Sequence, residues 1–507
     1  MRPLLLILVV ACGSVPAPAP NVAPVEPRAL EVPMSDPAEY AIERITRDAG
    51  KVIFERTGIG DPYRAGMPYP MFLALLKAYP KTFGATTGEL AQRFGFLARD
   101  PNPNSEDLDL REGLPIGMHL TVDPITNVPF VVSNCTLCHA ERVQWPFGEA
   151  LVIGLGNRRV RIHDYDAAFA AITQQPGFSA ERLGRLADDA ARERKLTWPA
   201  EFRALLVGAT LGELVKRAAA RADLRAHTAH NPPGRVATIE SFAFILGQLT
   251  RTPVTYADVV GWAKVPDVIG YAQRTSLSWD GSGEGPVDLL AVEADVATGV
   301  RIEWLERHPF QGASLGAYLR QPPKRPAFPG HIEFPRAKRG RVMFEDHCSD
   351  CHGHYAPDGR VIDYDEPIVP IEDLGTDPAR MRAITDSFER AANDPKLTRG
   401  YTKLRRSTGY IPPILTNVWA RAPYGHVAQW PSLAVLAMPP DKRPVAFVTD
   451  VDGVYDLVAV GMPWQAAPAP GFVHDSATPG FSVLGHPFLA ELGPEARADV
   501  IEYLKTL

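Results

Sequence analysis

Apolar side chains recur at every third or fourth position over several long stretches of the chain. This spacing predicts amphipathic helices over residues 38–45 and 71–79, which a proline-containing segment separates. Residues 163–225, rich in Ala, Leu, Arg and Glu, predict further helices, and residues 494–507 predict a closing amphipathic helix. The pattern therefore indicates a mainly α-helical protein.

Two short apolar runs, residues 114–122 and 128–132, interrupt this pattern and predict short extended segments. The proline-rich segment 322–326 is the clearest internal break, and we place a domain boundary there. The boundary divides the chain into an N-terminal domain over residues 36–325 and a C-terminal domain over residues 326–507. We expect both to be helical, with long loop-rich insertions and few short strands.

The N-terminus has the features of an export signal. Arg2 precedes an apolar run over residues 4–11, which is too short to span a bilayer as a mature helix. Cys12 follows in a setting that resembles a bacterial lipobox, so residues 1–12 predict a lipoprotein-type signal with a lipidated Cys12. The alternative is ordinary signal cleavage nearby, with Cys12 discarded.

Residues 13–35 are rich in proline, alanine and valine, a composition that predicts a stiff, extended tether. Together with the signal, the tether predicts an exported protein, either periplasmic or anchored to the outer membrane as a lipoprotein. The expected membrane contact is the lipid anchor alone.

Composition adds one exclusion. The 507 residues are 45% hydrophobic and 22% charged, as in ordinary globular proteins, and the net charge is −6. No basic run is present. The sequence therefore predicts no nucleic-acid partner.

The pattern C-x-x-C-H occurs twice, and it is the attachment signature of c-type haem. Two thiols at this spacing can each form a thioether with one macrocycle, and the adjacent imidazole can bind the iron. The residues concerned are Cys135, Cys138, His139, Cys348, Cys351 and His352. Two redox-active cysteine pairs, or one zinc site of four cysteines, are the alternatives, but neither requires a histidine after the second cysteine.

Five further elements are distinctive: residues 264–268, 279–281, 375–378, 414–419 and 422–426. Together with the two motifs, they resemble the bacterial di-haem cytochrome c peroxidase superfamily. The nearest branch is the one that contains the secreted rubber (polyisoprene) oxygenases. The resemblance extends over most of the chain from about residue 110 onward.

This resemblance implies two cytochrome c-like domains, each with one covalent haem c. His139 would be proximal to an open, reactive iron, and His352 would be proximal to a relay iron with His486 as its second ligand. Trp279 would carry an electron hole or line the pocket, although a packed tryptophan is the ordinary alternative. Some relatives hold a calcium ion between the domains, so calcium is a possible additional cofactor.

Other residues remain candidates for the axial positions of the two irons. For the second haem they are His426, His474, Met438 and Met462, and for the first they are Met118, His119 and His163. An open first iron is the favoured interpretation, by analogy with the family.

The predicted function is that of an exported di-haem oxidoreductase enzyme that reacts with peroxide or dioxygen. One expected partner is a small redox protein, or another electron donor or acceptor. An oxygenase would also bind an organic substrate. Peroxidase and oxygenase activities remain separate options. The alternatives are a non-enzymatic electron carrier with two closed irons and a haem-bearing enzyme that oxidises a partner protein.

Overall fold

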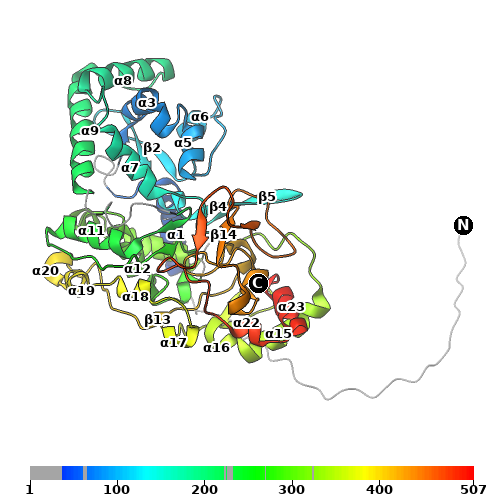
Figure 1. Ribbon diagram of the computed structural model, residues 1–507. Helices are drawn as coiled ribbons and strands as arrows, with labels where there is room; N and C mark the ends of the chain where they lie inside the picture. The colour runs from blue at the N-terminus through cyan, green and yellow to red at the C-terminus, as the bar shows by residue number, and fades with distance from the viewer. Residues whose placement is uncertain (1–36, 61–65, 222–223, 225–231, 269, 322–324) are drawn as a thin grey trace, which may run out of the picture. The chain divides into compact units, whose positions relative to one another are not determined.

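The computed structural model describes residues 37–60, 66–221, 224, 232–268, 270–321 and 325–507 (Figure 1). The predicted signal over residues 1–12, Cys12 and the tether over residues 13–35 lie outside the described residues. From residue 45 onward, the described residues form one compact unit. The boundary placed at residue 325 stays a prediction.

Helices predominate, as predicted, and the strands are short. The described helices of eight or more residues are α1 (Pro37–Arg56), α3 (Tyr69–Ala78), α5 (Thr87–Phe94), α7 (Ile162–Ile172), α8 (Ala180–Arg194), α9 (Ala200–Ala220), α11 (Thr238–Thr250), α12 (Val287–Ala297), α14 (Gln311–Arg320), α15 (Phe334–His347), α19 (Asp386–Asn393) and α23 (Pro494–Leu504).

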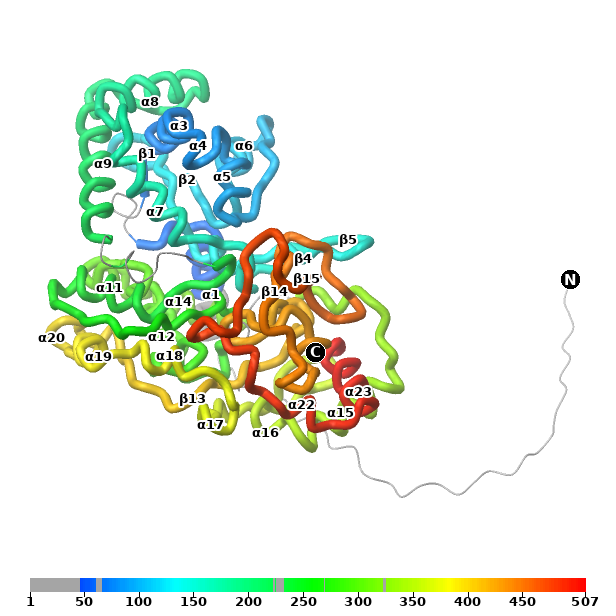
Figure 2. The backbone as a smooth tube through the Cα atoms, viewed as in Figure 1, coloured from blue at the N-terminus to red at the C-terminus, as the bar shows by residue number. Residues whose placement is uncertain are grey.

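The sequence pattern located six of these twelve described helices. The two N-terminal predictions correspond to α1 and α3, the segment 163–225 contains α7, α8 and α9, and the closing prediction is α23. Within residues 226–300, for which no helix was predicted, the structure has α11 and α12. Both helices are apolar on more than one face, and α11 packs against α12 and α19 (Figure 2), so neither has the single polar face that makes a helix visible in sequence.

The two predicted extended segments form an antiparallel pair, β2 (Met118–Val122) and β3 (Pro129–Ser133). Leu120 faces Val131 across it, and β1 (Met67–Pro68) pairs with the other edge of β3. Downstream, β4 (Ala140–Trp145) and β5 (Gly148–Ile153) form a hairpin that begins directly after His139. A second three-stranded sheet comprises β14 (Ala446–Thr449), β15 (Trp464–Ala466) and β16 (Val473–Asp475).

The helices α15 and α23 pack closely along one another near the C-terminus (Figure 1). Gly340 makes this approach possible, because a Cβ atom there would lie 1.8 Å from the backbone oxygen of Asp499. Arg336 and Arg339 reach across the same contact to the Asp499 carboxylate, each at 2.7 Å. The second C-x-x-C-H motif follows the C-terminus of α15, and the packing of α15 on α23 fixes the position of that terminus.

Candidate haem sites

The first motif is a single turn of 3-10 helix, η1 (Cys135–Leu137), that ends in His139. The side chain of Asn134 caps this turn by accepting a hydrogen bond from the Thr136 backbone N–H at 3.0 Å. The His139 N–H in turn donates to the Cys135 carbonyl at 2.9 Å. Both cysteines are free thiols, and burial raises the pKa of each, so they remain protonated near neutral pH.

The His139 imidazole is oriented for metal binding. Its Nδ1 lies 3.0 Å from the Pro266 carbonyl oxygen, which can only accept, so Nδ1 carries the hydrogen. Burial lowers the pKa of His139, which keeps the ring neutral. The remaining lone pair is therefore on Nε2, the arrangement typical of a metal-binding histidine held by a backbone carbonyl.

The second motif repeats this arrangement. It follows α15 as the short helix α16 (Ser349–His352), and His352 Nδ1 lies 2.8 Å from the Pro413 carbonyl oxygen. Burial again lowers the pKa of the imidazole. The two motif histidines, His139 and His352, are thus both neutral and both present Nε2 as the nitrogen with the lone pair.

The ring of His486 lies near that of His352. The two ring centroids are 6.2 Å apart and the ring planes are inclined by 50°. An imidazole nitrogen binds a transition metal at roughly 2 Å, and its ring centroid lies roughly 1 Å further away. Two imidazoles on opposite sides of one iron therefore have centroids about 6 Å apart. Burial lowers the pKa of His486 to about 3, so this ring is neutral as well.

A cavity of about 1550 Å³ adjoins the first motif, with Cys135, Cys138 and His139 in its wall. Typical ligand pockets measure roughly 300–1,000 Å³. The ring that His139 contacts is Phe54, with centroids 6.4 Å apart, and a phenyl ring offers no lone pair to a metal. The two motifs therefore differ: an imidazole opposes the second, and a large cavity adjoins the first.

The residues present fit the predicted haems, although haem itself stays a prediction. All three guanidinium nitrogens of Arg325 are buried without a hydrogen-bond partner, and burial lowers the pKa of this side chain to about 10. A carboxylate such as a haem propionate would satisfy such a group. In the part of the chain that the structure describes, no three His, Cys, Asp or Glu side chains gather into a metal-binding cluster. The predicted calcium ion therefore gains no candidate ligand set.

Trp279 connects the two backbone segments whose carbonyl groups contact His139 and His352. Its Nε1–H donates to the Lys264 carbonyl at 2.9 Å, and Lys264 lies two residues before Pro266. Its backbone carbonyl accepts from the Ile411 N–H at 2.8 Å, and Ile411 lies two residues before Pro413. Trp279 also lines the cavity. A tryptophan in this position is half-buried and tied to both sites.

Two carboxyl groups in the cavity wall were missed by sequence reasoning. Both belong to α12, and burial raises the pKa of Glu293 to about 8 and that of Asp295 to about 7. Glu293 is 0% exposed, and neither of its carboxylate oxygens has a hydrogen-bond partner. Asp295 accepts one hydrogen bond from Gln311 at 3.0 Å. Acidic residues within an otherwise apolar helix were the available signal.

Three other candidate ligands contact other side chains. His119 pairs with Asp109 at 2.6 Å. The His426 ring lies against that of Tyr410, with centroids 4.3 Å apart and ring planes inclined by 31°. His163 lines the cavity, but its Nε2 lies 2.9 Å from the Ser241 hydroxyl.

The remaining candidate ligands are one hydrogen-bonded histidine and three methionines that are buried or half-buried. The Nε2 of His474 lies 2.8 Å from the Phe481 carbonyl oxygen, whereas Met118 is buried in the N-terminal core and borders the cavity. Met462 is buried in the C-terminal core, and Met438 is half-buried.

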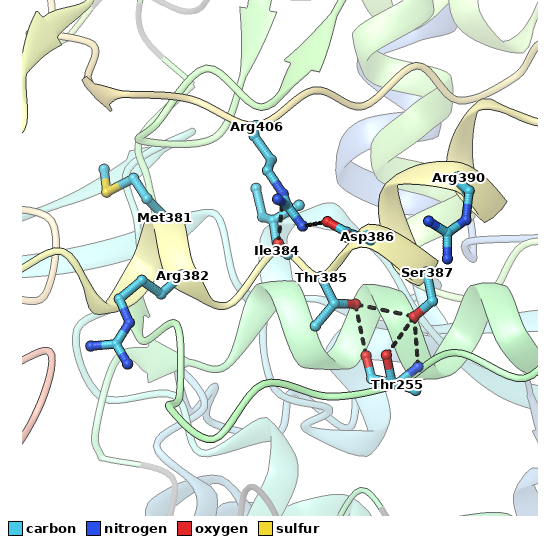
Figure 3. A pocket seen from close by; sticks show the side chains of 9 residues that line it. All are labelled: Thr255, Met381, Arg382, Ile384, Thr385, Asp386, Ser387, Arg390 and Arg406. Atoms are coloured by element: carbon cyan, nitrogen blue, oxygen red, sulfur yellow. Dashed lines mark hydrogen bonds and ion pairs between the residues drawn. The ribbon is translucent and has the colours of Figure 1, made fainter.

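A second pocket, of about 700 Å³, lies away from both motifs (Figure 3). Arg406 there donates to the Ile384 carbonyl and pairs with Asp386, and the Thr255 and Thr385 hydroxyls both lie within hydrogen-bond distance of Ser387. These polar groups satisfy one another, so the pocket presents no reactive arrangement.

Comparison with known proteins gives distant relatives. The chain is 25% identical over 292 residues to the uncharacterized protein y4iM of Sinorhizobium fredii, covering 48% of this chain and 64% of that protein. It is 26% identical over 250 residues to the uncharacterized protein y4iJ of the same organism, covering 37% of this chain and 41% of that protein. No family model matches the sequence. Across the described residues, no helix has both the length and the apolar character that crossing a membrane requires.

Proposed function

We propose that this protein is an exported di-haem c-type cytochrome with oxidoreductase activity, built from two cytochrome c-like domains. One haem would be attached at Cys135 and Cys138, with His139 as its proximal ligand. The other would be attached by the second motif, between His352 and His486. The observation that carries this assignment is the 6.2 Å separation of the His352 and His486 rings, together with the cavity beside His139.

The first haem would supply reaction with peroxide or dioxygen when bound. Glu293 would supply the proton chemistry. Its carboxyl group faces the same cavity and is neutral below about pH 8, so one Oε can donate a proton and take it back. A group with a pKa near the working pH is suited to general acid–base catalysis.

Trp279 would provide the connection between the two haems. Its hydrogen bonds to Lys264 and Ile411 join the two segments whose carbonyls orient the proximal imidazoles. A rigid aromatic side chain in this place supports electron or hole transfer between a reactive iron and a relay iron. A pure electron carrier is the competing function, and it requires both irons to be closed.

The test is an optical and EPR spectrum of the purified oxidised protein, before and after cyanide. We expect one low-spin haem that cyanide leaves unchanged and one open haem that binds it. His486→Ala should convert the low-spin haem into a second cyanide-binding haem. His354→Ala is the matched control, because His354 follows the same motif but is exposed and pairs with Glu345.

The outcomes separate the candidate functions. Two low-spin haems that ignore cyanide, also after partial reduction, would favour the electron carrier. A protein without covalent haem would refute the proposal as a whole. An unchanged spectrum in His486→Ala would reject only the assignment of the sixth ligand.

A further inference from the structure

His486 is held in a backbone conformation that side chains other than glycine seldom adopt. Its φ is +48°, and that of the preceding Gly485 is +92°. A Cβ atom at Gly485 would lie 2.7 Å from the Cβ of Thr376, and the His486 N–H donates to the Leu374 carbonyl at 2.9 Å. Such a loop persists only where its surroundings fix it.

The side chain of Arg443 donates hydrogen bonds to several carbonyl groups of this loop. The Arg443 guanidinium has five N–H donors, and each can be assigned to a different backbone carbonyl. Its Nε donates to Met438 at 3.2 Å, its Nη1 to Val483 at 2.9 Å and Gly485 at 2.5 Å, and its Nη2 to Leu436 at 2.8 Å and His486 at 3.0 Å. Three of the five acceptors thus belong to the loop that carries His486.

The environment of Arg443 makes this contact rigid and leaves its charge uncompensated. The residue is 3% exposed, and its guanidinium lies 5.1 Å from the centre of the Trp430 ring. Trp430 donates through Nε1 to the Val483 carbonyl at 3.0 Å, so it braces the same loop. Within the described ranges, no carboxylate forms an ion pair with Arg443. The positive charge therefore remains close to the His486 ring.

We propose that Arg443 is a positioning residue that holds His486 as the sixth ligand of the second haem and fixes a positive charge beside that iron. This inference rests on the proposed function, and it assigns the control of the relay haem to a side chain that is not itself a proposed iron ligand. The guanidinium acts through backbone carbonyls, and the buried charge favours the reduced, less positive iron.

Lysine and glutamine substitutions separate these two effects. Arg443→Lys keeps the charge, but an ammonium group has three donors and no planar fork, so it cannot hold five carbonyls. Arg443→Gln removes the charge as well. We expect both variants to weaken His486 ligation by about 10- to 100-fold, the range found for groups that orient metal ligands. Only Arg443→Gln should also lower the reduction potential of the second haem through loss of charge.

The experiment measures carbon monoxide uptake per reduced holoprotein, the low-spin EPR signal and the reduction potential. The wild type should bind carbon monoxide at the first haem alone, and the Arg443 variants at both haems. Arg497→Lys is the control, because Arg497 donates to a single neighbouring carbonyl, that of Ala437, at 2.8 Å. Thermal stability is recorded as well, because general loosening of the fold would also release His486 and open a second carbon monoxide site. A melting temperature close to that of Arg497→Lys excludes this explanation.

Arg443→Ala with added methylguanidinium gives an independent test. Methylguanidinium should restore the low-spin signal, and methylammonium at the same concentration should not. Wild-type carbon monoxide uptake in Arg443→Lys and Arg443→Gln, with a normal low-spin signal, would overturn the inference. Failure of the signal to recover in Arg443→Ala would also count against it. If His486→Ala itself leaves the second haem low-spin, the ligand assignment of the proposed function fails instead.

Discussion

Replacement of Glu293 by glutamine should change the pH dependence of stability. In the unfolded chain this carboxyl ionises near its ordinary pKa of 4.5, and burial raises the pKa to about 8 in the folded protein. Between these values the folded state keeps a proton that the unfolded state has released. Stability contributed by Glu293 is therefore complete below about pH 4.5 and is lost as the pH rises towards 8.

The size of the effect follows from the shift. A shift from 4.5 to about 8 corresponds to a free energy on the order of 4 kcal/mol by the end of this range. The substituted glutamine side chain would carry no charge at any of these pH values, so the variant escapes this loss. Relative to the wild type, Glu293→Gln should gain on the order of 4 kcal/mol in unfolding free energy between mildly acidic and alkaline solution.

Urea unfolding of the holoprotein at about pH 5 and about pH 9 measures this difference. Glu149→Gln is the matched control, because it removes the same charge from a side chain that is 54% exposed. Its unfolding free energy relative to the wild type should stay constant within about 0.5 kcal/mol. A Glu293→Gln difference that does not change with pH would show that this carboxyl is not held neutral in the cavity wall.

Two further substitutions test the connection between the sites and the C-terminal helix pair. Trp279→Phe keeps an aromatic ring but leaves the Lys264 carbonyl without its indole donor, so it should cost about 1–3 kcal/mol of stability and slow electron transfer between the haems in flash photolysis. Unchanged transfer would remove Trp279 from the pathway. Gly340→Ala would place a Cβ 1.8 Å from a backbone oxygen of α23 and should cost at least about 1–3 kcal/mol. Gly208→Ala, on a helical surface with nothing within 4 Å of the new Cβ, should instead stabilise the protein by about 0.5–1 kcal/mol. Equal melting temperatures for these two alanine variants would contradict the packing described for α15 and α23.

Periodicity located α1, α3 and α23. It missed α12, in which seven of the eleven residues are buried and acidic residues interrupt the apolar positions. The same burial hid Glu293. An acidic residue in sequence gives no sign of whether its neighbours in space will supply a charge, a donor or only apolar atoms.

The candidate haem residues were visible because a covalent attachment needs a fixed local spacing. His486 could be named only through the resemblance, since its partner His352 lies on a distant segment. Nothing in the sequence marked Arg443. Its partners are backbone carbonyls, which every residue possesses, and only the folded loop shows that five of them converge on one guanidinium.

The position of Trp279 limits how this protein can be divided. Its indole is bonded within the segment that orients His139, and its carbonyl is bonded to the segment that orients His352, on the other side of residue 325. A chain cut at the proline-rich segment would leave the Ile411 N–H without its acceptor in one fragment and the Trp279 carbonyl without its donor in the other. The two C-x-x-C-H sites therefore share one hydrogen-bonded framework within a single compact unit of the described chain.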